Sequence, residues 1–135
     1  MTARFAALPT IMAWIERSAD SGGLDSDQSK RMQLAAEELF VNSIHHGYGG
    51  ECDAGIELAL DIDAVRATLT FIDHAPPFNM NDAAPLTASA ERIGGVGLNL
   101  VRALANAIRY RRESNSNVTI LDFPPPTQHR NIQAI

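Results

Sequence analysis

Two neighbouring runs of the chain alternate between apolar and polar residues, and this alternation constrains the fold more than any other feature. In both runs, 56–62 and 65–72, every second side chain is apolar: Ile56, Leu58, Leu60 and Ile62, then Val65, Ala67, Leu69 and Phe71. Alternation with a period of two indicates half-buried strands. The turn between them is predicted at Asp61-Ile-Asp-Ala. One face of this hairpin therefore needs a covering layer.

Two helices are predicted before the hairpin. The first has apolar side chains at helical spacing and is expected to end before Ser21-Gly22-Gly23: Leu8, Ile11, Met12 and Ile15. The second is predicted from about Asp27 to His46, with Asp25, Ser26 or Asp27 as its cap and Gly47 as a left-handed terminus. It carries one stripe of small and apolar residues that could pack on a sheet: Met32, Ala36, Leu39 and Ser43.

After the hairpin the pattern changes. The stretch from His74 to Ile93 has weak periodicity and is predicted to be a loop with a short helical turn. A helix follows from Leu98, and then two strands at 107–112 and 118–123, joined by Glu113-Ser-Asn-Ser-Asn. This order predicts an α+β fold: a two-layer α/β sandwich with helices on one face of a mixed, mostly antiparallel sheet. We expect one domain over 1–123 and an extended C-terminal tail over 124–135.

Composition excludes several functions. The formal charge of −5 and the pI near 5.2 argue against a general affinity for nucleic acid or anionic membranes. No stretch approaches the roughly 18 apolar residues that span a bilayer. Cys52 is the one cysteine, so an internal disulfide is impossible, which suits a reducing compartment. We therefore expect a cytoplasmic protein that contacts neither nucleic acid nor membrane directly.

Three polar features could carry chemistry, and the first lies on the long predicted helix. Glu38, Asn42 and His46 are four residues apart and therefore share one face. A polar face is typical of simple solvent exposure. A Glu and an Asn one turn apart could also divide a phosphoryl-transfer reaction, the carboxylate accepting a proton and the amide oxygen coordinating Mg²⁺.

The second feature is an aspartate at the end of a predicted strand. Asp73 is followed by His74, Ala75 and two prolines, which give a rigid turn. Its carboxylate could accept a hydrogen bond from the exocyclic amine of a base, or it could be an ordinary turn aspartate.

The third feature is the glycine cluster Gly94-Gly95-Val96-Gly97, which precedes Leu98 at the start of a helix. Glycines allow close approach of an anion, and a helix N-terminus offers N–H donors. The cluster lacks the Lys-Ser/Thr of a P-loop and the preceding strand of a dinucleotide fingerprint. A flexible hinge is the alternative interpretation.

Together, the three features resemble the GHKL (histidine-kinase-like) ATPase superfamily, and more closely its anti-sigma-factor serine/threonine kinase branch. The segment from Glu38 to Tyr48 resembles that branch's N-box, and Asp73-His-Ala-Pro-Pro-Phe78 its first glycine box. Gly95-Val-Gly97-Leu98 resembles the second glycine box, and Asn117-Val-Thr119 the closing strand. The resemblance covers about residues 8–123 and implies the Bergerat-type ATP-binding fold.

The resemblance also implies roles for the matching residues. Glu38 would be the general base for a protein hydroxyl, and Asn42 the Mg²⁺ ligand. Asp73 would bind the adenine amino group, while His46 would shape the helix end. The full set implied to contact ATP is Asn42, Asp73, Ala75, Gly95, Val96, Gly97, Leu98 and Thr119, with Gly95 and Gly97 cradling the phosphates and Thr119 near the adenine.

The implied substrate is a serine or threonine of a small anti-anti-sigma (STAS-type) protein. A sigma factor, or an equivalent regulator, would compete for the kinase, which in this branch is often a homodimer. Two alternatives remain open at this point. One is a nucleotide-gated binding module with weak or no kinase activity, and the other is a detached histidine-kinase catalytic domain.

Ala75 departs from the branch's pattern, which has glycine two residues after the aspartate. If the backbone there requires a positive φ, alanine would be strained and nucleotide affinity reduced. If glycine serves only close approach, one methyl group would be tolerated. The loop from His74 to Ile93 is also short for an ATP lid.

Overall fold

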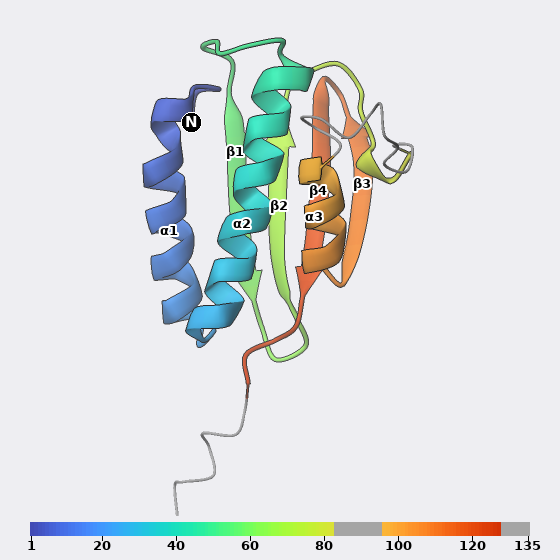
Figure 1. Cartoon of the computed structure of the whole chain (residues 1–135). Coiled ribbons are helices and arrows are strands. Elements are labelled where there is room, and N and C mark those ends of the chain that lie inside the picture. The colour runs from blue at the N-terminus through green and yellow to red at the C-terminus, as the bar shows by residue number, and fades with distance from the viewer. Residues whose placement is uncertain (83–95, 128–135) are drawn as a thin grey trace, which may run out of the picture.

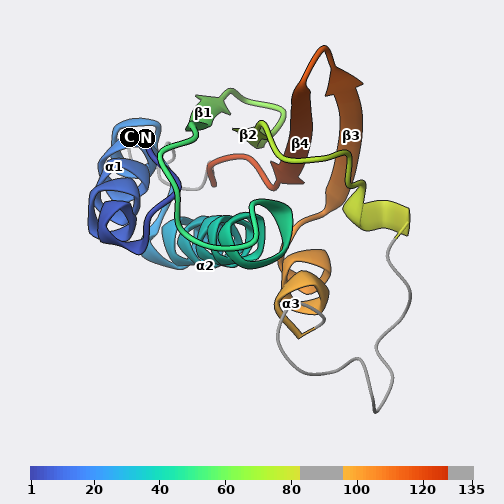
Figure 2. The ribbon, with the colours of Figure 1, turned by 90° about the horizontal axis from the view of Figure 1, so that it is seen from above.

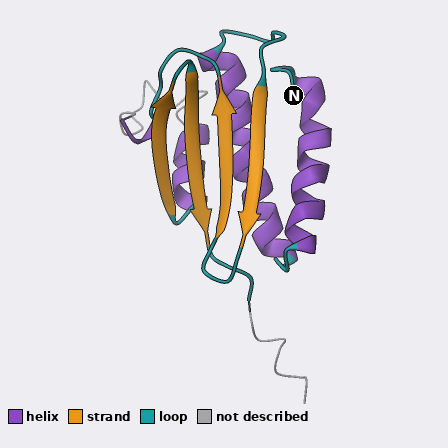
Figure 3. Cartoon of the chain, turned by 180° about the vertical axis from the view of Figure 1, so that it is seen from behind, coloured by secondary structure: helices purple, strands orange, loops and turns teal. Residues whose placement is uncertain are grey.

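The computed structural model of the chain describes residues 1–82 and 96–127 (Figure 1). Within these residues three α-helices, α1 (Leu8–Ser21), α2 (Ser26–Asn42) and α3 (Val96–Leu104), accompany a four-stranded sheet. Its strands are β1 (Ile56–Ile62), β2 (Ala67–Asp73), β3 (Ala107–Glu113) and β4 (Ser116–Phe123). The helices lie along one side of the sheet in Figure 2, and Figure 3 shows no helix over the other face. The predicted α+β sandwich is confirmed.

The sheet has the order β1-β2-β4-β3, and every pairing in the described part of the chain is antiparallel. It is therefore more regular than the mixed sheet expected from the sequence. β2 and β4 occupy the centre, and their register places Asp73 opposite Asn117 and Phe71 opposite Thr119. Side chains of directly opposed residues lie on the same face. Polar residues from two separate hairpins thus meet at one end of the sheet.

The apolar core fills the space between the two layers. α2 contacts both α1 and α3, and its predicted stripe is buried at every position, as expected. The largest fully buried side chains come from the helices, the strands and the residues that connect them: Ile11, Ile15, Met32, Phe40, Ile44, Ile56, Leu69, Met80, Val101, Val118 and Leu121. In the described residues, no helix is long and apolar enough to cross a membrane. The core fixes α2 against the sheet and thereby determines which α2 residues face the Asp73 end.

The C-terminal end of α2 differs from the prediction. The α-helix ends at Asn42, and Ser43–Gly47 form a turn of π-helix instead of continuing to His46 as α-helix. Gly47 lies inside this turn and has no positive φ, so its predicted role as a left-handed terminus is wrong. The left-handed residues are Gly49 and Gly50, with φ of 79° and 143°. A π-helical turn is wider than an α-helical one and shifts the side chains that follow it around the axis.

The first hairpin turn is displaced from its predicted position, and the second is shorter than predicted. The first lies at Asp63–Arg66, not at Asp61–Ala64, because the Asp63 carboxylate accepts hydrogen bonds from the N–H groups of Val65 and Arg66. Val65 is consequently outside β2 and 67% exposed. The second turn is tighter than expected and consists of Ser114 and Asn115, with Ser114 at φ 56°.

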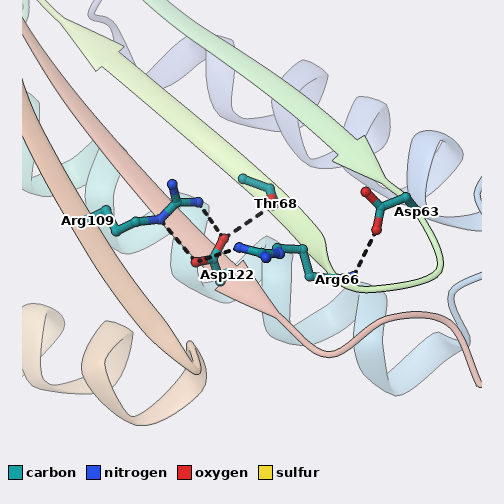
Figure 4. Close-up of polar contacts among 5 residues, drawn as sticks. All are labelled: Asp63, Arg66, Thr68, Arg109 and Asp122. Atoms are coloured by element: carbon teal, nitrogen blue, oxygen red, sulfur yellow. Dashed lines mark hydrogen bonds and ion pairs between the residues drawn. The ribbon is translucent and has the colours of Figure 1, made fainter.

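On the face without helices, an ion-pair cluster ties three strands together at the end of the sheet away from Asp73 (Figure 4). The buried carboxylate of Asp122 accepts hydrogen bonds from Nε and Nη2 of Arg109 at 3.1 and 2.8 Å. The Thr68 hydroxyl donates to it at 3.2 Å, and Arg66 lies 3.9 Å away. These contacts link β2, β3 and β4, and so help to fix the β2–β4 register.

A capping box stabilises the start of α2. Asp25 caps the helix by accepting the N–H of Gln28 at 2.8 Å, and the Gln28 side chain accepts the N–H of Asp25 at 2.8 Å. We predict that Asp25→Ala lowers the free energy of unfolding by about 1 kcal/mol. Asp27→Ala is the matched control, because Asp27 is an acidic first-turn residue that does not form the cap. Urea denaturation measures both, and equal losses would contradict the assigned cap.

Candidate functional site

A pocket opens at the end of the sheet where β2 and β4 bring Asp73 and Asn117 together. Its walls come from α2 and the π-helical turn, from β2 and the loop after it, from α3 and from β4. The lining residues are Leu39, Asn42, Ser43, His46, Gly47, Phe71, Asp73, Ala75, Pro76, Pro77, Phe78, Met80, Leu98, Asn117 and Thr119. An apolar cavity with a few convergent polar groups is the usual form of a small-molecule site.

The predicted site residues gather around this pocket. Its walls contain five of the residues that the sequence implied for nucleotide contact, together with His46: Asn42, Asp73, Ala75, Leu98 and Thr119. Glu38 and Gly97 lie against each other where α2 meets α3. Val96 is the first residue of α3. Gly94 and Gly95 lie outside the described residues. Motifs from four distant parts of the sequence thus converge on one location.

Asp73 is a buried carboxylate in the pocket that is held by three hydrogen-bond donors. It is the last residue of β2 and is 8% exposed. Ser43 Oγ donates to its Oδ2 at 2.7 Å, while Asn117 Nδ2 and the backbone N–H of Ala75 donate to Oδ1 at 2.9 and 3.2 Å. A buried carboxylate requires such donors because it has lost its water. Three donors from three elements fix the direction in which the remaining acceptor capacity points.

Sequence reasoning missed two members of this network. Ser43 was predicted only as part of a packing stripe, and Asn117 only as part of a closing strand. Ser43 reaches Asp73 from the π-helical turn, and Asn117 reaches it across the β2–β4 pairing. Hydroxyl and amide side chains are common throughout the chain, so residue type gave no signal. The packing of the π-helical turn against β2 identifies Ser43, and the β2–β4 register identifies Asn117.

The structure decides between the two expectations for Ala75. Among the described non-glycine residues only Ser114 has a positive φ, so the backbone at Ala75 is not strained. The Ala75 side chain is buried and faces Gly47, where an added Cβ would lie 3.0 Å from the Ala75 Cβ. The carbonyl of Ala75 accepts hydrogen bonds from Arg112 Nη1 at 2.8 Å and Asn117 Nδ2 at 3.2 Å. The absence of a side chain at Gly47 accommodates the extra methyl group.

Glu38 is not among the residues that line the pocket; it lies one turn before Asn42, on the α2 surface that faces α3. A Cβ placed on Gly97 would clash with Glu38 Oε1, so the carboxylate occupies the space that a larger residue at 97 would fill. Burial raises the pKa of Glu38, and the negative charge of Glu37 raises it further. A carboxylate with a raised pKa is a stronger proton acceptor than an exposed one.

This raised pKa predicts a pH-dependent cost to stability. In the folded state Glu38 binds its proton more tightly than in the unfolded chain, so stability is lost as pH rises through the folded-state pKa. We expect Glu38→Gln to unfold at higher urea concentration than the wild type near neutral pH. The difference should disappear below the ordinary pKa of 4.5, where both side chains are neutral.

Glu57→Gln is the control for this measurement, since Glu57 is exposed on β1 and loses the same charge without burial. A gain for Glu38→Gln that persisted unchanged in acid would mean that the carboxylate's charge is not its cause.

Comparison with known proteins agrees with this geometry. The histidine kinase-like ATPase domain model matches residues 1–123. The RsbU and RsbW domains of Rv1364c from Mycobacterium tuberculosis share 18% identity with the chain at a TM-score of 0.67, over 92% of this chain and 30% of that one. No curated protein matches the sequence.

Two histidine kinase structures are also similar. The histidine kinase domain of the blue-light activated kinase of Erythrobacter litoralis has 16% identity and a TM-score of 0.54, with 95% of this chain and 64% of that one covered. AdeS of Acinetobacter baumannii has 14% identity and a TM-score of 0.55, with 90% and 64% covered. The chain thus spans less than two thirds of the length of these proteins. At such identities the likeness shows the fold, and the family assignment rests on the match to residues 1–123: the chain belongs to the histidine kinase-like ATPase domain family.

Proposed function

We propose that the chain binds Mg·ATP in this pocket and transfers the γ-phosphate to a serine or threonine of a STAS-type anti-anti-sigma protein. The observation that carries the proposal is a fixed, buried acceptor inside the pocket together with a partly buried carboxylate one turn before Asn42, against the first turn of α3. Asp73 lies at the end of β2, and Glu38 lies against α3. The nucleotide base would bind at Asp73, and the reacting phosphate would lie toward Glu38.

The pocket suits an adenine ring. Phe71, Met80 and Leu98 supply apolar surface, and Asp73 supplies an acceptor for the exocyclic amine. Thr119 stands opposite Phe71 on β4 and contributes its hydroxyl beside the same surface. An apolar pocket with one oriented acceptor selects for a ring that is apolar on its faces and that carries a hydrogen-bond donor at one edge.

The phosphate end combines Asn42 and Gly97. The side chain of Asn42 faces the pocket from the last turn of α2, and its amide oxygen is a hard ligand suited to Mg²⁺. Mg²⁺ usually takes one or two protein ligands and the remainder from phosphates and water, so a single amide is compatible with its needs. Gly97, in the first turn of α3, allows close approach of phosphate oxygens to backbone N–H donors. When bound, Mg²⁺ would neutralise charge that develops on the transferring group.

Glu38 is proposed as the general base. It would accept the proton of the attacking hydroxyl, a role that the raised pKa favours. The mouth of the pocket carries Phe78, which is 43% exposed, together with exposed prolines at 76 and 77. This apolar rim is available for contact with a protein substrate.

The circuit is proposed from the similarity to the RsbW domain and from the chain's acidity. The net charge of −5 disfavours direct contact with nucleic acid, so regulation through protein partners is the simpler route. We propose that the unphosphorylated anti-anti-sigma protein and a sigma factor, or an equivalent regulator, compete for this chain in the cytoplasm. The active form is proposed to be a homodimer, and residues 1–123 its single ATPase domain.

The test is phosphate transfer from radiolabelled Mg·ATP to candidate anti-anti-sigma proteins. Glu38→Gln should lower kcat by about 10²–10⁴-fold while ATP binding persists, because general-base catalysis contributes rate and not affinity. Asn42→Ala should abolish the Mg²⁺-dependent part of ATP binding. Glu57→Gln is the control, since it removes a negative charge from the exposed surface of β1 and should leave kcat almost unchanged.

Each outcome discriminates among the alternatives. Acid-stable phosphate on the substrate supports serine or threonine transfer, and acid-labile phosphate would indicate a histidine kinase. ATP binding without transfer to any partner would replace the kinase by a nucleotide-gated binding module. Equal activity of Glu38→Gln and wild type would remove Glu38 from the proposed role.

A further inference from the structure

The amide of Asn117 stands at the junction of two strands and the loop that borders the pocket. It is 5% exposed, and Nδ2 lies 2.9 Å from Asp73 Oδ1, 3.2 Å from the Ala75 carbonyl and 3.0 Å from the Pro76 carbonyl. On its other side, Oδ1 accepts the backbone N–H of Phe78 at 3.0 Å. One side chain thus connects the end of β2, the loop over the pocket and β4.

The direction of this amide is determined by its partners. Three oxygens face the NH₂ group, and a backbone N–H faces the carbonyl oxygen. Rotating the amide by half a turn would place its oxygen against three acceptors and its NH₂ against a donor. Asn117 therefore always presents a hydrogen to Asp73 Oδ1.

A second residue holds Asn117 in place from the edge strand. The phenolic hydroxyl of Tyr110 on β3 donates to Asn117 Oδ1 at 2.5 Å. Tyr110 is half-buried and does not line the pocket. A chain of hydrogen bonds therefore runs from β3 through β4 to β2, and ends at the carboxylate of Asp73. Hydrogen bonds in such a series polarise and orient one another.

We propose that Asn117, held by Tyr110, is a positioning residue that makes the pocket select a purine with an exocyclic amine over one with a carbonyl at the same place. This inference rests on the proposed nucleotide binding and extends it to base specificity. The Asp73 carboxylate has about four acceptor positions, of which Ser43, Asn117 and the Ala75 N–H occupy three. With Asn117 in place, the acceptor position that remains on the Asp73 carboxylate points in one fixed direction.

A directed acceptor discriminates between two bases of nearly equal shape. The amine of adenine donates to it, whereas the carbonyl of hypoxanthine would place a second acceptor against it. Without Asn117 the carboxylate keeps only the donors from Ser43 and the Ala75 N–H and is oriented less firmly, and the loop over residues 75–78 loses the anchors at Pro76 and Phe78. Selectivity should then fall more than the affinity for nucleotides in general.

The experiment is calorimetric titration with ATP, ITP and ADP. We expect the wild type to bind ATP roughly 10- to 100-fold tighter than ITP. The buried Asp73 carboxylate would be hydrogen-bonded to the amine of ATP, whereas in ITP it would face another acceptor. Asn117→Ala should weaken ATP binding about tenfold, leave ITP binding nearly unchanged, and so lower the ATP/ITP ratio about tenfold. The ratio of ATP to ADP affinity, which reports on the phosphate end, should not change.

Tyr110→Phe keeps the ring and removes the hydroxyl, so it should lower the ATP/ITP ratio in the same direction by a smaller factor, about two- to fivefold. It also keeps the inference testable if Asn117→Ala does not fold. Asn115→Ala, in the exposed β3–β4 turn, is the matched control and should change neither affinity nor ratio.

The outcomes separate this inference from the proposed function. Equal weakening of ATP and ITP in Asn117→Ala, or an unchanged ratio in both variants, would reduce Asn117 to a structural anchor and overturn the inference while ATP binding stands. A wild type that binds no nucleotide would overturn the proposed function itself, and the inference with it.

Discussion

A carboxylate that is withdrawn from water needs hydrogen-bond donors from the protein, and the arrangement of this site follows from how Asp73 obtains them. One donor comes from Ser43 in the π-helical turn after α2, one from Asn117 on β4, and one from the backbone of Ala75. Each donor requires its own element to be in register with β2. The pocket walls are therefore aligned through one side chain, and an error in helix, strand or loop position would leave a buried charge unsatisfied.

The two sides of the site are built in different ways. At the Asp73 side, hydrogen bonds between strands hold the side chains of Asp73 and Asn117. The carbonyls of Ala75 and Pro76 in the following loop accept hydrogen bonds from Arg112 and Asn117. At the Glu38 side, the carboxylate lies against the small residue Gly97, and burial raises its pKa. The first arrangement suits recognition of a fixed group. The second suits a group that must exchange a proton.

The sequence predicted the elements better than the contacts between them. Alternation identified Ile56–Ile62 to the residue, and helical spacing identified the buried face of α2. The first hairpin turn was misplaced because the Asp63 side chain, and not residue propensity, determines where the chain reverses. The pairing of Asp73 with Asn117 was out of reach, since it depends on the register of strands 44 residues apart. Motif spacing thus located the pocket, but the residues that orient its acceptor are visible only in three dimensions.

The contact between Gly47 and Ala75 has a consequence for how this pocket can change over time. A Cβ on residue 47 would lie 3.0 Å from the Ala75 Cβ, closer than most such contacts, so a methyl group at both positions requires one backbone segment to move by a few tenths of an ångström. A glycine at 75 would make room for alanine at 47, whereas alanine at both would push the loop away from the π-helical turn. The effect of a substitution at either position is therefore conditional on the residue at the other. An exchange of the methyl group from position 75 to position 47 would therefore meet less strain through the state in which both are glycine.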